Sequence, residues 1–120
     1  MTTTRRVLVV DDDAILRLAL VRMLTREGID CDCAADGREG LERVATGVYD
    51  LVITDMRMPH MTGLELIRAA SAILDPLPRF ILLSGYHDAP DEALVGVTVV
   101  LAKPLHPRLL RDHVREALAC

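Results

Sequence analysis

Aromatic residues are almost absent from this chain. It contains no Trp, one Phe and two Tyr among its 120 residues, whereas hydrophobic residues make up 51%. A folded core must therefore consist mainly of Leu, Val, Ile, Ala and Met side chains. The length predicts one domain of ordinary size, residues 1–120, and the hydrophobic fraction is ample for a single core.

Long apolar segments and long basic runs are also missing. No apolar stretch approaches the roughly 18 residues of a membrane span. The polar start, Met1–Arg6, lacks the apolar centre of a secretory signal. The 14 basic and 18 acidic residues give a net charge of −4, which disfavours direct binding to nucleic acid. We therefore expect no membrane partner and no direct nucleic-acid partner.

Cysteines are few and lack the spacing of metal ligands. Cys31 and Cys33 flank one residue of a probable strand, and Cys120 is the third. An odd number of cysteines without a framework of pairs is typical of reduced thiols. This usage predicts a cytoplasmic protein.

Apolar runs of strand length alternate with segments of helical period, which predicts β-α-β units and a parallel sheet. The expected strands are Arg6–Val10, Asp30–Ala34, Asp50–Thr54, Arg79–Leu83 and Thr98–Leu101. The expected helices are a broad apolar stripe over Ile15–Leu24, Asp36–Gly47 with Asp36 and Glu39 in capping-box spacing, Gly63–Ile73, a weak Pro90–Leu94, and Pro107–Leu118. Right-handed crossovers then give an α/β three-layer sandwich with strand order 2-1-3-4-5.

Polar side chains follow four of these strands directly. Asp11–Asp13 follow the first strand, Asp55 the third, Ser84 the fourth and Lys103 the fifth. The carboxyl ends of parallel strands line one crevice, and the first and third strands are neighbours at the centre of the sheet. Carboxylates alone would repel one another there. A hard divalent cation would offset the carboxylates, and a phosphoryl group would interact with the hydroxyl and the ammonium. Asp13 stands where an N-cap of the next helix is expected.

Four short motifs carry a family resemblance. They are Val9–Asp13, Asp55–Pro59 with Gly63, Leu83–Gly85, and Lys103–Pro104. Because these four motifs occur in this order, the chain resembles the receiver domain of two-component response regulators over essentially its full length. The resemblance implies the flavodoxin-like (βα)5 fold of chemotaxis regulators, with one receiver domain in residues 1–120 and no output domain.

The resemblance also implies a reaction. A histidine kinase or a phosphotransfer protein would donate a phosphoryl group from phosphohistidine to Asp55, giving an aspartyl phosphate. Mg²⁺ would be held by Asp12, Asp55 and the main-chain carbonyl of Arg57, with Asp11 acting mostly through water. Oxygen ligands with retained waters are what Mg²⁺ prefers.

Further residues acquire roles from the same resemblance. Lys103 would pair with one phosphoryl oxygen, and Ser84 would hydrogen-bond another. The protein would not be an enzyme in the ordinary sense, because it would catalyse only its own phosphorylation and dephosphorylation. Phosphorylation would switch a surface for a downstream protein partner, or for a homodimer through the face formed by the fourth helix, the fifth strand and the fifth helix.

The sequence departs from the family in that region. Val100 stands where receivers often have an aromatic residue, three positions before the lysine. Ser84 and Lys103 are 103 − 84 = 19 positions apart, fewer than the family usually has, and the loss falls on the fourth helix. Leu105 stands where Phe is frequent. These changes predict an intact phosphorylation site beside a remodelled output face.

Three alternatives stay open at this point. Haloacid-dehalogenase-like phosphatases also use an Asp nucleophile, but they need a second Asp two residues later. Arg57 occupies that position after Asp55, and Asp13 fits only formally after Asp11. The chain could also be a pseudo-receiver that is never phosphorylated, or a receiver module from a hybrid histidine kinase. The kinase, pathway and output partner cannot be read from the sequence.

Overall fold

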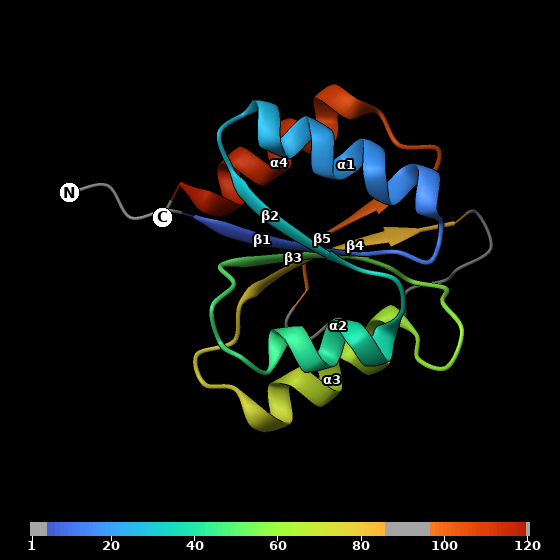
Figure 1. The fold of residues 1–120 in the computed structure, drawn as a ribbon, viewed down its shortest axis with the longest axis vertical. Coiled ribbons are helices and arrows are strands. Elements are labelled where there is room, and N and C mark those ends of the chain that lie inside the picture. The colour runs from blue at the N-terminus through green and yellow to red at the C-terminus, as the bar shows by residue number, and fades with distance from the viewer. Residues whose placement is uncertain (1–4, 86–96, 120) are drawn as a thin grey trace.

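Five parallel strands form one sheet in the order β2-β1-β3-β4-β5 (Figure 1). The structure is a computed structural model that describes residues 5–85 and 97–119. The predicted strand order is confirmed. It places β1 beside β3 at the point where the order reverses, which is the position where ligands bind in open α/β sheets.

The observed elements lie close to the predicted ones. The strands are β1 Arg6–Val10, β2 Asp30–Ala34, β3 Leu51–Asp55, β4 Arg79–Ser84 and β5 Val97–Ala102. The described helices are α1 Ala14–Arg26, α2 Gly37–Val44, α3 Gly63–Ile73 and α4 Pro107–Leu118. The third strand begins one residue later than predicted and includes Asp55. The predicted weak helix Pro90–Leu94 lies outside the described residues.

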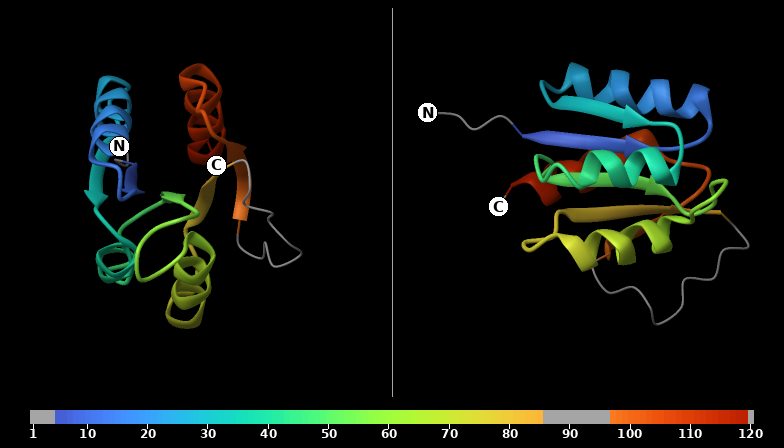
Figure 2. Two further views of the ribbon diagram at one scale, coloured as in Figure 1. Left: turned by 90° about the vertical axis from the view of Figure 1, so that its right-hand side faces the viewer. Right: turned by 60° about the horizontal axis from the view of Figure 1, so that its bottom comes forward.

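Helices cover both faces of the sheet (Figure 2). α1 and α4 lie on one face, and α2 and α3 lie on the other. Successive residues of β1 therefore enter different cores, with Val7 and Val9 on the α1 side and Leu8 and Val10 on the α2 side. All four are fully buried. A sheet buried on both faces requires such continuous apolar strands, which explains the strand-length apolar runs.

The apolar stripe of α1 is only partly buried. Leu20 and Leu24 belong to the core, whereas Ile15 is 83% exposed and Leu18 is 51% exposed. The helix thus presents an apolar edge to solvent next to its first turn. None of the four described helices combines the length and the apolar character that crossing a bilayer requires.

Side-chain caps fix where the first two helices begin. The Asp13 carboxylate accepts hydrogen bonds from the backbone N–H groups of Ile15 and Leu16 at 3.0 and 3.2 Å, so its predicted role as N-cap is confirmed. Asp36 caps α2 by accepting from the Glu39 N–H at 2.9 Å. The Glu39 carboxylate accepts from the residue before the cap instead of closing the predicted capping box.

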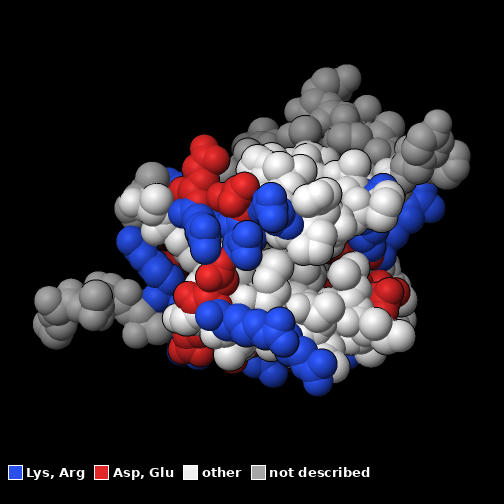
Figure 3. All heavy atoms as spheres, turned by 90° about the horizontal axis from the view of Figure 1, so that it is seen from above, with Lys and Arg blue, Asp and Glu red and all other residues white. Residues whose placement is uncertain are grey.

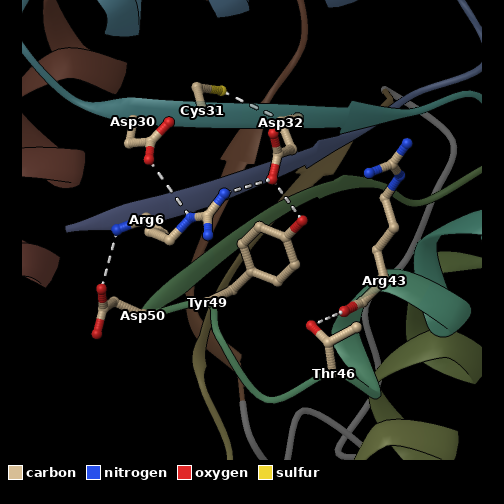
Figure 4. Close-up of polar contacts among 8 residues, drawn as sticks. All are labelled: Arg6, Asp30, Cys31, Asp32, Arg43, Thr46, Tyr49 and Asp50. Atoms are coloured by element: carbon tan, nitrogen blue, oxygen red, sulfur yellow. Dashed lines mark hydrogen bonds and ion pairs between the residues drawn. The ribbon is translucent and has the colours of Figure 1, made fainter. Parts of the chain in front are cut away.

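A polar cluster joins the amino ends of β1 and β2 to the residues before β3 (Figure 4). The Arg6 guanidinium lies 3.5 Å from the carboxylate of Asp30 and 3.2 Å from that of Asp32. The Arg6 backbone N–H donates to the Asp50 carboxylate at 2.9 Å, and the Tyr49 hydroxyl donates to Asp32 at 2.7 Å. Burial and the bond to Asp32 raise the pKa of Tyr49, so its hydroxyl remains a donor. We refer to these five residues as the Arg6 cluster.

Two half-buried thiols lie on the edge strand. Cys31 and Cys33 in β2 are free and pack against the core on the α1 side. Burial raises the pKa of Cys31 to about 12, which keeps this thiol protonated. Both are free thiols that pack against the core, in agreement with the reduced thiols that the sequence predicted. Cys120 lies outside the described residues.

Candidate functional site

Three carboxylates meet at the carboxyl ends of β1 and β3. Asp11, Asp12 and Asp55 each offer an oxygen, and these oxygens lie within 4.8 Å of one another. Asp11 is completely buried and Asp55 is 5% exposed, whereas Asp12 is open to solvent. The expectation that the ends of the two central strands bring these side chains together is therefore confirmed.

One ammonium group faces this acidic cluster. Lys103, the single lysine of the chain, places its Nζ 3.0 Å from Oδ1 of Asp55. The Lys103 backbone N–H donates to the carbonyl of Ser84 at 2.9 Å, which extends the pairing of β4 with β5 by one bond. Ser84 is 5% exposed. The residues predicted at the ends of β4 and β5 are thus joined through their backbones.

The carboxylates are only partly compensated. Burial raises the pKa of Asp11, and the charge of Asp55 acts in the same direction against a hydrogen bond from the Asp13 N–H. Burial likewise raises the pKa of Asp55 in spite of the pairing with Lys103. Burial disfavours the charge of Lys103, yet its bond to Asp55 raises the Lys103 pKa on balance. The site holds more negative charge than its own cation satisfies.

Asp11 shows this imbalance most directly. Its Oδ1 accepts from the Asp13 N–H at 2.9 Å, whereas its Oδ2 is buried without a hydrogen-bond partner among the described residues. A buried charged oxygen without a partner is costly. Three oxygen donors around such an atom suit a hard cation, so this group could hold a metal ion.

Backbone contacts fix the segment that carries Asp55. The Met56 N–H donates to the Leu83 carbonyl at 2.8 Å, and the Gly63 N–H donates to the Met56 carbonyl at 2.9 Å. A Cβ at Gly63 would lie 2.6 Å from the carbonyl oxygen of Asp55. Only glycine therefore permits α3 to begin this close to the strand end. The buried Thr54 hydroxyl adds a bond to the Asp55 carbonyl at 3.1 Å.

The start of α3 is also capped on both sides. The Thr62 hydroxyl accepts from the Glu65 N–H, and the Glu65 carboxylate accepts from the Thr62 N–H, both at 3.1 Å. This capping box ends the loop that follows Asp55. Arg57 lies in that loop and is exposed. The carbonyl of Arg57 as a metal ligand stays a prediction.

Sequence reasoning missed four supporting residues. The Arg17 guanidinium donates to the carbonyl of Asp11 at 2.7 Å from the second turn of α1. No spacing rule signals this contact, because it joins a side chain to a main-chain carbonyl six residues earlier. The spacing of Thr62 and Glu65 was a readable signal. The contact of the Thr54 hydroxyl gave no signal, because a Thr inside a strand is ordinary.

Comparisons with known proteins agree with this fold. The profile of the response regulator receiver domain family matches residues 7–115. The response regulator MprA of Mycolicibacterium vanbaalenii is 38% identical over 92 residues, which are 77% of this chain and 39% of that protein. The sensor protein EvgS of Escherichia coli K12 is 36% identical over 112 residues, which are 92% of this chain and 9% of that protein. The chain thus spans well under half the length of either relative.

Solved structures show the same arrangement. The response regulator TrrA from Thermotoga maritima, solved in complex with Mg²⁺ and BeF, has a TM-score of 0.86 at 32% identity and covers 96% of this chain and 100% of its own. The chemotaxis protein CheY4 of Vibrio cholerae has a TM-score of 0.84 at 30% identity, covering 97% and 100%. The fold is therefore the flavodoxin-like α/β sandwich, with an acidic cluster at its switch point. The chain belongs to the response regulator receiver domain family.

Proposed function

We propose that this receiver domain accepts a phosphoryl group on Asp55. A carboxylate oxygen of Asp55 attacks the phosphorus of a phosphohistidine. The P–N bond breaks as the P–O bond forms, and the departing imidazole nitrogen takes up a proton. The observation that carries this proposal is the buried Asp55 carboxylate, flanked by two further carboxylates and 3.0 Å from the ammonium of Lys103. The domain would catalyse only its own phosphorylation and dephosphorylation.

We further propose that the acidic cluster holds Mg²⁺. The ligands would be Asp11, Asp12, Asp55 and the main-chain carbonyl of Arg57. The partnerless Oδ2 of Asp11 and the oxygen-only donor set support this choice of ion. When bound, Mg²⁺ would offset the negative charge of the carboxylates and of the incoming phosphoryl oxygens.

Lys103 and Ser84 would recognise the phosphoryl group itself. The Lys103 ammonium, already directed at Asp55, would pair with one phosphoryl oxygen as a point charge. The Ser84 hydroxyl would donate to another oxygen, in place of its bond to the Gly85 carbonyl at 3.3 Å. Because the backbone of Lys103 is bonded to that of Ser84, the two groups would respond to phosphorylation together.

Receiver domains interact with histidine kinases and with downstream effectors. We propose a histidine kinase or a phosphotransfer protein as the donor here. Ile15 and Leu18 on α1 and Leu109 at the start of α4 are exposed apolar side chains on the helices that follow β1 and β5. Covering them would stabilise a docked donor protein.

The output would be a change of protein contacts beside Ser84 and β5. Val100 is a half-buried residue of β5, so no aromatic ring can change position there. We expect the signal to leave through the loop Gly85–Asp91, of which residues 86–91 lie outside the described residues, toward a downstream partner or a second copy of the domain.

Chemical phosphorylation tests the proposed acceptor. Incubation with acetyl phosphate and Mg²⁺ should add one phosphate, roughly 80 Da, in a linkage labile to hydroxylamine. Asp55→Asn should abolish the addition. Asp50→Asn changes an exposed aspartate before the same strand, at the other end of the sheet, and should label like the parent. Labelling of Asp55→Asn at the parent rate would refute the assignment.

A further inference from the structure

Charge is distributed very unevenly over the molecule. α1, Glu27 and α4 carry six arginines and three acidic residues, a local charge of 6 − 3 = +3, whereas the whole chain has −4 and the remainder therefore −7. The arginines are Arg17, Arg22, Arg26, Arg108, Arg111 and Arg115. Figure 3 views this face and shows basic side chains, with acidic side chains among them, beside uncharged surface.

A groove runs between the two helices. One hollow of about 380 Å³ is lined by Ala19, Arg22, Met23, Arg26, Glu27 and Arg111. A second of about 550 Å³ is lined by Met23, His106, Pro107, Arg108 and Arg111. The two hollows share Met23 and Arg111 and are therefore neighbours, and together we call them the α1–α4 groove. Its lining combines apolar side chains with arginines from both helices.

One carboxylate already occupies part of this groove. Glu27 lies 2.6 Å from the guanidinium of Arg115 and 3.5 Å from that of Arg111, so it compensates two of the three arginines of α4. Arg22 and Arg26 on α1 are exposed and make no ion pair within the described residues. Like charges four positions apart destabilise a helix. The groove therefore retains a repulsion that external carboxylates would relieve.

We propose that the α1–α4 groove binds an acidic amphipathic helix of a partner protein. Carboxylates of that helix would pair with Arg22, Arg26 and Arg108, as Glu27 pairs with the arginines beside it. An apolar residue between them would contact Met23. Arginine forks match carboxylates in geometry as well as in charge.

Two features favour a protein helix over a nucleic acid. The lining includes Ala19 and Met23 beside the arginines, and these two side chains can contact a leucine-like side chain, which a phosphate backbone lacks. The charge of −7 on the rest of the domain would repel a long polyanion. This surface lies outside the acidic cluster of Asp11, Asp12 and Asp55, so binding there does not require phosphorylation.

A designed probe tests the proposal on the intact chain. The probe is a helical peptide that presents both Glu and Leu side chains on one face. In the control peptide, every Glu is replaced by Gln. Titration of ¹⁵N-labelled protein should move amide resonances of α1 and α4 with the Glu peptide only. Arg22→Glu combined with Arg26→Glu should weaken binding at least tenfold.

Matched controls separate local recognition from net charge. Arg38→Glu combined with Arg68→Glu makes the same charge change on exposed residues of α2 and α3, and should alter the affinity less than twofold. Arg26→Gln should weaken binding while leaving the melting temperature equal or higher, because it removes repulsion. Both doubly substituted proteins should still be labelled by acetyl phosphate, so a failure here is independent of the proposed phosphorylation.

Three results would overturn the proposal. Equal weakening by both pairs of substitutions would reduce the effect to net charge. Equal binding of the Gln peptide, or amide shifts confined to other surfaces, would exclude carboxylate recognition by this groove. Stronger binding of a short DNA duplex than of the Glu peptide would assign the arginines to a polyanion instead.

Discussion

The two ends of the sheet use the same kinds of residues to opposite effect. At the amino end, Arg6 contacts three aspartates, and Tyr49 adds a donor to one of them. At the carboxyl end, three aspartates share Lys103, and Asp11 keeps a buried oxygen without a partner among the described residues. Each end also has one buried side-chain atom without a hydrogen-bond partner among the described residues, Nε of Arg6 at the amino end and Oδ2 of Asp11 at the carboxyl end. The ends differ in burial, because Asp30 and Asp50 are exposed whereas Asp11 and Asp55 are buried. Buried negative charge, and not acidity alone, distinguishes the candidate site.

Replacing the cationic side chain at each end, Lys103 or Arg6, should produce the largest effect on the labelling rate and the clearest contrast between the two ends. Lys103→Gln should slow labelling by acetyl phosphate about 100-fold, because a donor directed at the transferred group is lost. Arg6→Gln should leave the labelling rate unchanged and lower the melting temperature. Rate measurements by intact-protein mass spectrometry check both. Equal rates for the parent and Lys103→Gln would remove Lys103 from the proposed site.

Adding a divalent cation should act at one end only. Mg²⁺ at about ten times its Kd should stabilise the fold by about 1.4 kcal/mol, which raises the melting temperature by roughly 5 °C. Asp12→Ala should remove most of this shift, and Asp30→Ala in the Arg6 cluster should retain it. Thermal unfolding with and without Mg²⁺ provides the measurement. A full shift in Asp12→Ala would contradict the metal site.

One conservative substitution should change stability in opposite directions at the two ends. Without metal, Asp11→Asn should raise the free energy of unfolding by about 1 kcal/mol, because it removes a buried charge whose Oδ2 has no partner in the described structure. Asp32→Asn should lower it by about 1 kcal/mol, because Asp32 is paired but partly exposed. Urea unfolding in the presence of EDTA measures both. The same sign for both variants would contradict the comparison.

Acidification should produce the smallest effect. The folded-state pKa values of Asp11 and Asp55 lie above the ordinary value of 3.8. Their contribution to stability is therefore present below that value and is lost as pH rises through the raised values. Mg²⁺ would bind the ionised carboxylates of Asp11 and Asp55. The stabilisation by Mg²⁺ should therefore increase as pH rises through the raised pKa values, by less than about 1 kcal/mol. Melting curves with and without Mg²⁺ at several acidic pH values test this, and an increment independent of pH would argue against these ligands.

The carboxyl end could be predicted from the sequence because topology brings strand ends together. Once the alternation of strands and helices was recognised, Asp11 and Asp55 had to meet at the switch point, and they do. Lys103 and Ser84 followed from the same rule. Local spacing also fixed the N-caps Asp13 and Asp36, since a cap acts only on residues of the next turn.

The amino end could not be predicted in the same way. The Arg6 cluster depends on which charged residues face one another across three strands, and neither periodicity nor a motif encodes that pairing. The burial of α1 was also less than its apolar stripe suggested, because Ile15 and Leu18 extend beyond the core. Apolar spacing predicts a face of a helix but not how far the sheet beneath it reaches.

The close contact at Gly63 limits how this domain can diverge. Any other residue there would bring a Cβ to 2.6 Å from the Asp55 carbonyl and 2.7 Å from a methyl group of Leu82. To make room for this Cβ, the end of β3 that carries Asp55 would have to move. A substitution at position 63 would therefore displace the carboxylate of Asp55. A descendant of this domain could lose Gly63 without penalty only after it no longer depended on the placement of that carboxylate. A glycine at position 63 thus indicates that the domain still depends on the placement of the Asp55 carboxylate.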